Sequence, residues 1–197
     1  MTDCLHRSIE ANGIRMHIAE QGMGPLVLLC HGFPESWYSW RHQLPALATA
    51  GYRAVAPDMR GYGQTDRPEG IEQYTLLHMA GDMVGLLDEL GVEQAVIVGH
   101  DWGAPVAWTS ALMRPDRFRA VAALSVPYIP RGMIRPTDGL RFAAGDNFNY
   151  MLYFQTPGIA EAELEQDVRA TIRRVLYWVS GEAPGRPPKP RTPSSST

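Results

Sequence analysis

Asp101 lies in a turn whose residue types suit a nucleophilic carboxylate. It follows the apolar run 94–98, precedes a stretch with helical spacing, and is flanked by the small residues Gly99, Gly103 and Ala104. At so tight a strand-to-helix corner, larger side chains at these three positions would collide with the strand or the helix. The corner forces the Asp101 side chain outward, where backbone N–H groups and the positive end of the helix dipole favour its ionised form. Because an ionised carboxylate can attack carbon and form a covalent ester, the pattern predicts a nucleophile elbow with aspartate in place of serine.

A second motif, His31-Gly32-Phe33-Pro34, directly follows the apolar run 26–30. In folds with a nucleophile elbow, the loop after such a strand contributes to the oxyanion hole. We therefore expect the backbone N–H groups of Phe33 and Trp102 to converge on an oxygen near Asp101. We also expect His31, Pro34 and Trp102 to line the substrate-binding site. The Phe33-Pro34 bond is a candidate for a cis peptide. The alternative interpretation is an ordinary turn at the end of a strand that happens to contain a proline.

Hydrolysis of an ester intermediate needs a base, and no histidine that could supply it follows Asp101 in the sequence. All six histidines, at positions 6, 17, 31, 42, 78 and 100, precede Asp101. Neighbouring side chains on a strand point to opposite faces, so His100 is expected to point away from the cleft. His31 is expected to order its loop by hydrogen bonding, His78 to lie on a helix flanking the sheet, and the other three to be peripheral. An ester at Asp101 is therefore expected to accumulate.

Strand and helix patterns alternate along most of the chain. A hairpin is expected around Asn12-Gly13, from residues 6–10 and 14–20, and strands at 26–30, 52–56, 94–98 and 119–125. Helical spacing covers 37–48, 76–90 and 102–114. Strands that alternate with helices imply right-handed crossovers and a mostly parallel sheet flanked by helices, with the chemistry at the carboxyl ends of the strands. The sequence thus predicts an α/β fold with Asp101 at such an end.

The character of the sequence changes near residue 128. We expect residues 1–127 to form the N-terminal part of an α/β core, and 128–180 a partial helical cap. One amphipathic cap helix is expected to carry Leu164, Val168, Ile172, Leu176 and Val179 on a single face. Residues 181–197 are rich in Pro and Ser and are expected to be a disordered tail.

The composition narrows the class of partner. The chain has 197 residues and a formal net charge of -3, which argues against nucleic acid as a main partner. Two cysteines, Cys4 and Cys30, are too few for a disulfide scaffold and are expected to be free thiols. There is no signal core at the start and no apolar run long enough to span a bilayer. We expect a cytoplasmic protein that needs no cofactor and no metal; its oligomeric state stays open.

Several motifs together resemble the epoxide hydrolases of the α/β-hydrolase fold, both bacterial members and the hydrolase domain of mammalian soluble epoxide hydrolase. The resemblance runs from about residue 6 to 180 and is carried by His31-Gly32-Phe33-Pro34-Glu35-Ser36-Trp37-Tyr38-Ser39-Trp40-Arg41, Asp58-Met59-Arg60-Gly61-Tyr62-Gly63, Gly99-His100-Asp101-Trp102-Gly103 and Leu152-Tyr153-Phe154-Gln155-Thr156-Pro157-Gly158. It implies a small-molecule epoxide as substrate and a vicinal diol as product. It also implies Asp101 as nucleophile, the Phe33 and Trp102 amides as oxyanion hole, and Tyr153 as one of two tyrosines that hydrogen-bond the epoxide oxygen. In the family, the remaining core strands, the second tyrosine, a charge-relay acid and the histidine come later than this chain extends, so we expect a chain truncated at its C-terminus.

Two alternatives remain open. A haloalkane or haloacid dehalogenase of the same fold would use the same displacement by Asp101, and the Trp102 indole could hold halide. Against this, Phe33 stands where the haloalkane dehalogenases usually have an asparagine. The other alternative is a non-catalytic binding or assembly subunit that keeps the cleft but works with a partner.

Overall fold

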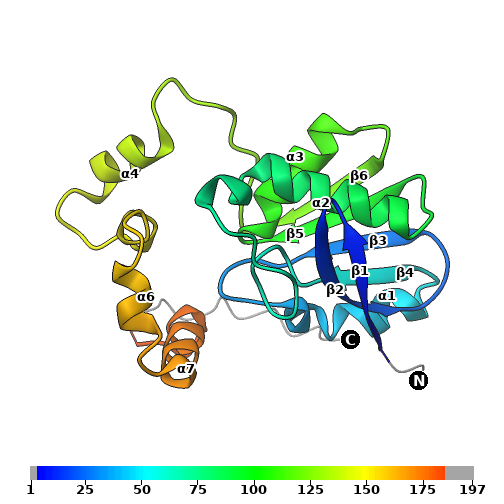
Figure 1. Ribbon diagram of the computed structural model, residues 1–197, viewed down its shortest axis with the longest axis horizontal. Coiled ribbons are helices and arrows are strands. Elements are labelled where there is room, and N and C mark those ends of the chain that lie inside the picture. Colours follow the sequence, from blue (N-terminus) through cyan, green and yellow to red (C-terminus); the bar gives the residue numbers. More distant parts are fainter. Residues whose placement is uncertain (1–3, 185–197) are drawn as a thin grey trace, which may run out of the picture. The chain divides into compact units, whose positions relative to one another are not determined.

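The computed structural model describes residues 4–184. The chain divides into two compact units between Ile129 and Pro130. The first unit contains the sheet and the second the helices α4 to α7 (Figure 1). Each unit is described by itself below.

A six-stranded sheet forms the centre of the first unit, in the order β1-β2-β4-β3-β5-β6 (Figure 1). The strands are β1 Leu5–Ala11, β2 Ile14–Gln21, β3 Leu26–Cys30, β4 Arg53–Pro57, β5 Ala95–His100 and β6 Phe118–Leu124. β3 pairs in parallel with β4 and β5, and β5 pairs in parallel with β6. β1 and β2 are antiparallel, with the turn at the predicted Asn12-Gly13. The predicted, mostly parallel sheet is confirmed.

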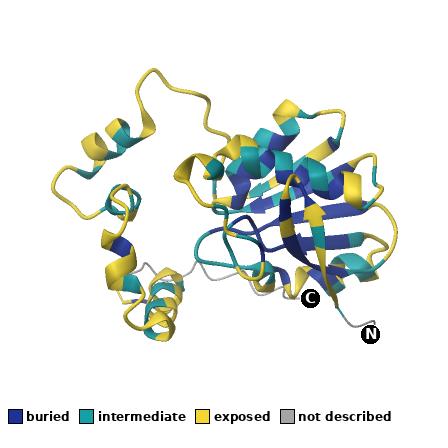
Figure 2. Cartoon of the chain, viewed as in Figure 1, coloured by how far each residue is buried: buried dark blue, intermediate teal, exposed yellow. Residues whose placement is uncertain are grey.

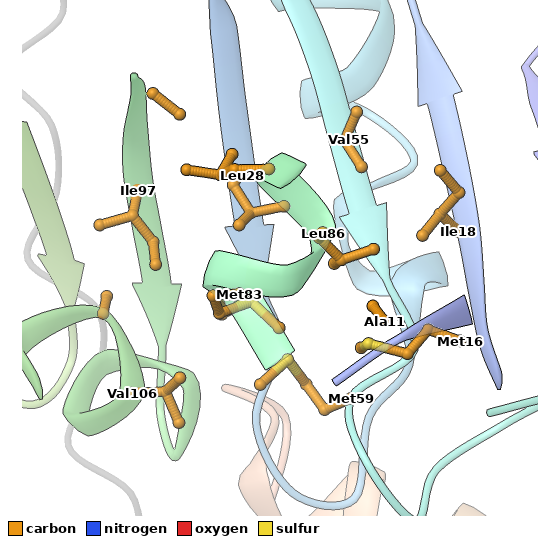
Figure 3. Packing of buried hydrophobic residues seen from close by; sticks show 14 of the residues in the cluster. Ala11, Met16, Ile18, Leu28, Val55, Met59, Met83, Leu86, Ile97 and Val106 are labelled. Atoms are coloured by element: carbon orange, nitrogen blue, oxygen red, sulfur yellow. Dashed lines mark hydrogen bonds between the residues drawn. The ribbon is translucent and has the colours of Figure 1, made fainter. Parts of the chain in front are cut away.

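Helices cover both faces of this sheet. They are η1 Trp37–Trp40, α1 Gln43–Thr49, η2 Ile71–Tyr74, α2 Leu76–Glu89 and α3 Gly103–Met113. On one face, Met83 and Leu86 of α2 and Val106 of α3 pack against strand residues such as Leu28 and Ile97 (Figure 3). On the other face, Trp40 and Leu44 pack against Val27 and Leu29. This two-sided burial explains why every residue of β3 is apolar and buried.

β5 positions Asp101 and lies between β3 and β6. Ala95 and Ile97 are buried on the α2/α3 face, while Val96 and Val98 are half-buried on the α1 face. Among the described residues, β6 lies at one edge of the sheet and β1 at the other, and Ala120, Ala122 and Leu124 of β6 are exposed. On the α1 face, η1 and α1 contact β2, β3 and β4.

The second unit has the helices α4 Pro136–Ala144, α5 Tyr150–Tyr153, α6 Ile159–Leu164 and α7 Val168–Val179. Within its described residues only Ala160 and Ala183 are buried, in contrast with the sheet of the first unit (Figure 2). The predicted continuous helix through Leu164 and Val179 is wrong. Leu164 ends α6, and a new helix begins after Asp167, whose side chain accepts a 2.9 Å hydrogen bond from the Ala170 N–H. Most of the predicted tail, 185–197, lies outside the described residues.

The described residues contain no helix that is long and apolar enough to cross a bilayer. Cys4 and Cys30 are free thiols, as predicted. Cys30 is fully buried at the end of β3, and this burial raises its pKa to about 12. A thiol so far from ionisation at neutral pH is not a nucleophile.

Candidate active site

Asp101 occupies the sharp corner between β5 and α3, in a left-handed backbone conformation with φ of 51°. Residues other than glycine rarely adopt this backbone conformation, and aspartate tolerates it better than most other residue types. The flanking glycines have no room for a side chain. A Cβ on Gly99 would lie 2.6 Å from the Ala104 Cα, and one on Gly103 would lie 2.7 Å from the His31 carbonyl oxygen. The small residues are therefore required, as the sequence predicts, because strand, helix and loop backbones meet at this corner.

The loop after β3 contacts the Asp101 carboxylate directly. The Phe33 backbone N–H donates a 2.9 Å hydrogen bond to Asp101 Oδ1. The Phe33-Pro34 peptide is cis, as predicted. Gly32 allows this approach, since a Cβ there would lie 2.5 Å from the Asp101 Cβ. The Phe33 amide therefore contacts the Asp101 carboxylate itself, and an oxyanion hole formed by the Phe33 and Trp102 amides stays a prediction.

His31 uses both of its ring nitrogens to order this loop. Its Nδ1 lies 2.8 Å from the Gly32 carbonyl oxygen, and the Met59 backbone N–H donates a 2.9 Å hydrogen bond to its Nε2. A nitrogen that accepts from an N–H carries no proton, so the ring is neutral with its proton on Nδ1. Burial lowers the pKa of His31, which favours the same neutral form. We therefore revise the expected substrate contact of His31: its ring is buried and its nitrogens are bound to the backbone.

Trp102 directly follows Asp101 in the sequence and Pro34 directly follows Phe33, and both stay candidates for lining the site. Trp102 is the N-cap residue of α3, and 45% of its surface is exposed. Pro34 is half-buried. A partly exposed indole on the residue after Asp101 is an apolar group that a substrate can contact.

Glu35 is a residue of this site that the sequence does not single out. Its Oε2 accepts a 3.2 Å hydrogen bond from the Gly32 N–H and lies 3.3 Å from His100 Nδ1. His100 is therefore bound to the loop that carries Phe33, a contact that the expected orientation of its side chain did not include. The only local signal is the spacing of Gly32 and Glu35, which suits a side chain that folds back onto a turn.

His17 is buried, whereas the sequence places it at the periphery. Its Nδ1 lies 2.8 Å from Asp58 Oδ2, and its Nε2 lies 3.1 Å from His6 Nδ1. The Trp37 N–H donates to the other Asp58 oxygen at 3.0 Å. These contacts tie β2 to the end of β4, which is a structural role. Among the described residues, no cluster of three or more His, Cys, Asp or Glu side chains could hold a metal ion.

Tyr153 belongs to the second unit, so its surroundings are described there alone. Its O–H donates a 2.5 Å hydrogen bond to Glu163 Oε2 in α6. This bond to a carboxylate raises the pKa of the Tyr153 phenol. Glu163 is thus the partner of a candidate catalytic tyrosine, although its place in the sequence suggests only a solvated helix turn.

Residues 25–168 match the profile of a family described as the alpha/beta hydrolase fold. The chain belongs to the alpha/beta hydrolase fold family. The strand order, the left-handed residue after β5 and the loop after β3 are therefore parts of an alpha/beta hydrolase core.

Relatives with epoxide hydrolase names match most of this alpha/beta hydrolase chain. It is 55% identical over 172 residues to epoxide hydrolase A of Mycobacterium tuberculosis, covering 86% of this chain and 53% of that protein. It is 51% identical to bifunctional epoxide hydrolase 2 of Sus scrofa, covering 82% of this chain and 29% of that protein. The crystal structure of epoxide hydrolase A from Mycobacterium thermoresistibile superposes with a TM-score of 0.87 at 51% identity, covering 91% of this chain and 57% of that one. The chain spans about half the length of the bacterial relatives that it matches.

Proposed function

We propose that this chain carries the nucleophile half of an epoxide hydrolase site, with Asp101 as the attacking carboxylate. The single observation that carries the proposal is the 2.9 Å hydrogen bond from the Phe33 N–H to Asp101 Oδ1 at a left-handed strand-to-helix corner. The names of the relatives favour an epoxide over an alkyl halide as substrate. They also favour an enzyme over a non-catalytic binding or assembly subunit.

In the proposed first step, an Asp101 oxygen attacks an epoxide carbon and the ring C–O bond breaks. The electron pair of that bond goes to the former ring oxygen, which takes a proton to become a hydroxyl. Tyr153 is our candidate donor of this proton. The product is an ester between Asp101 and a hydroxyalkyl group, so the adduct has the combined mass of protein and epoxide. Phe33 N–H holds one carboxylate oxygen and orients the other for attack.

Hydrolysis of the ester needs a base that activates water. His31, the imidazole of the same loop, has both nitrogens bound to the backbone and is buried. It therefore cannot take a proton from water without giving up one of these bonds. Because general-base catalysis contributes about 10²- to 10⁴-fold, the adduct is expected to form faster than it decays.

The test is incubation of the chain with a reactive aryl epoxide, followed by intact-mass analysis and peptide mapping. We expect one adduct, on Asp101. Asp101→Asn keeps the shape of the side chain and tolerates the left-handed backbone, so it serves as the matched control and should form no adduct. Absence of any adduct on the folded wild-type chain would refute the proposal. Sustained diol production by the purified chain would refute the expected accumulation. If the chain released halide from an alkyl halide faster than it formed the epoxide adduct, the result would favour the dehalogenase.

We also propose a cytoplasmic location. Two free thiols support it, as does a composition with 20% charged residues and 45% hydrophobic residues.

A further inference from the structure

We propose that Glu35 is a positioning residue that fixes the Phe33 amide at Asp101, an inference that rests on the proposed function. Glu35 Oε2 lies 3.2 Å from the Gly32 nitrogen and 3.3 Å from His100 Nδ1. Gly32 directly precedes Phe33, and His100 directly precedes Asp101. One carboxylate oxygen therefore joins the two chain segments whose next residues form the Phe33–Asp101 contact.

The backbone of Glu35 completes this arrangement. The Gly32 carbonyl accepts hydrogen bonds from the Glu35 N–H, at 3.1 Å, and from His31 Nδ1, at 2.8 Å. The Gly32 carbonyl and the Phe33 N–H belong to one planar peptide unit and point in opposite directions. Holding the carbonyl therefore aims the N–H, which donates to Asp101 Oδ1. Glu35 thus binds both peptide units of Gly32, one through its side chain and one through its backbone.

The burial and charge of the Glu35 side chain give these contacts weight. The side chain is only 19% exposed, and the His100 side chain is 38% exposed. A carboxylate that accepts from a backbone N–H in a partly desolvated place forms a stronger hydrogen bond than a neutral acceptor does. Gly32 itself has no side chain to hold it in place, and the approach of its Cα to Asp101 leaves no space for one. The loop therefore depends on its neighbours for its position.

The experiment compares Glu35→Ala, Glu35→Gln and the matched control Glu89→Gln, which removes one exposed carboxylate from the end of α2. The first readout is the rate of adduct formation on Asp101 with an aryl epoxide. We expect E35A to be slower by about 10- to 100-fold, since small misplacements of a reacting group have effects of this size. Gln keeps a carbonyl that can accept from the Gly32 N–H, so E35Q should restore most of the rate. E89Q should react at the wild-type rate.

The second readout is the Phe33 amide resonance in a sample labelled with ¹⁵N-phenylalanine, assigned by a Phe33→Leu variant. A weakened hydrogen bond moves the amide proton upfield, so we expect this shift in E35A, a smaller one in E35Q and none in E89Q. If the substitutions merely disturbed the core, the melting temperature would change, but the Phe33 amide shift would not decrease from E35A to E35Q to E89Q.

The two proposals fail separately. If the wild-type chain forms an adduct and E35A forms it equally fast, the role of Glu35 is refuted and the proposed function stands. If the wild-type chain forms no adduct, the proposed function fails, and the amide resonance alone decides whether Glu35 positions Phe33. Should E35A not fold, His100→Ala removes the second contact of the same oxygen, and an unchanged Phe33 amide in that variant would overturn the proposal.

Discussion

Asp101 combines an uncommon backbone conformation with a carboxylate that is held by a neighbouring amide. The amide is held in turn by His31, whose neutral ring bridges the Gly32 carbonyl and the Met59 N–H. The protonation state of one buried imidazole therefore controls the order of the loop. Protonation of His31 Nε2 would place its N–H against the Met59 N–H, which now donates to that nitrogen.

His31 should make the chain sensitive to acid. Its pKa is lowered by burial from an ordinary value of 6.5, so below that pH the unfolded chain binds a proton that the folded chain does not. The stabilising contribution is present above about 6.5 and is lost as the pH falls toward the lower, folded-state pKa. We expect the free energy of unfolding to fall between pH 7 and pH 5 with a slope of up to about 1.4 kcal/mol per pH unit from this group.

Urea unfolding at several pH values measures this slope. His31→Gln should flatten it, whereas His42→Gln, which removes an exposed imidazole, should leave it in place. An equal slope in the His31→Gln variant would contradict the assignment.

The sequence predicts Asp101, Phe33 and Gly32 because their roles depend on local rules, namely a tight corner and a turn after a buried strand. It misses the Glu35–His100 contact and the His17–Asp58 contact because each joins residues that are far apart in the chain, by 65 and 41 positions. Pairing over such distances depends on strand register, which the apolar runs 26–30 and 94–98 do not specify.

At the scale of elements, an ion pair buried between a loop and α2 holds the first unit together. Arg60, just after β4, donates from Nε and Nη2 to the two Asp82 oxygens in α2, at 2.8 and 2.5 Å. Both side chains are almost fully buried, and Asn12 of the β1–β2 turn also donates to Asp82 Oδ1, at 2.8 Å. Three segments therefore meet at one carboxylate.

Asp82→Asn is expected to destabilise the fold by about 3–5 kcal/mol, because it leaves the Arg60 charge buried without a partner. The matched control is Asp138→Asn, which breaks the exposed pair with Arg141 in α4 and should change stability by about 0–1 kcal/mol. Chemical unfolding of the two variants measures the difference. Equal effects would mean that burial of the Arg60–Asp82 pair has no bearing on stability.

Element boundaries also show where sequence patterns stop being informative. The apolar spacing of Leu164 and Val168 suits one helix, yet the chain breaks between them. The break follows from Asp167, whose side chain binds the Ala170 N–H and starts a new helix. Capping by aspartate competes with helix continuation, and periodicity alone does not reveal which one wins.

At the scale of the whole molecule, the two units differ in how much they bury. The first has a continuous core, and the described part of the second buries only Ala160 and Ala183. The segment 129–135, which contains the boundary between the units, has no regular helix or strand and exposes Met133 and Ile134.

Within residues 4–184, limited trypsin digestion should therefore cut first at Arg131, which is exposed in this segment. Arg135 is also exposed but directly precedes Pro136, and trypsin does not cleave an Arg–Pro bond. A fragment that ends there and contains the whole sheet should persist, because cleavage within it requires the core to open. Mass spectrometry of the time course identifies the first cut. Early cleavage at Arg53, the first residue of β4, or at Arg60, three residues after its end, would contradict the division into a stable and a less stable unit.

The backbone at the Asp101 corner determines which residues selection for folding alone would retain at positions 99, 101 and 103. Gly99 and Gly103 have no space for a side chain, so selection for folding alone preserves them. Position 101 is under the opposite pressure, since a left-handed backbone is easier for glycine than for aspartate. A lineage that no longer used the carboxylate would lose aspartate at this position while it kept both glycines. The residue that such decay would erase first is still present in this chain.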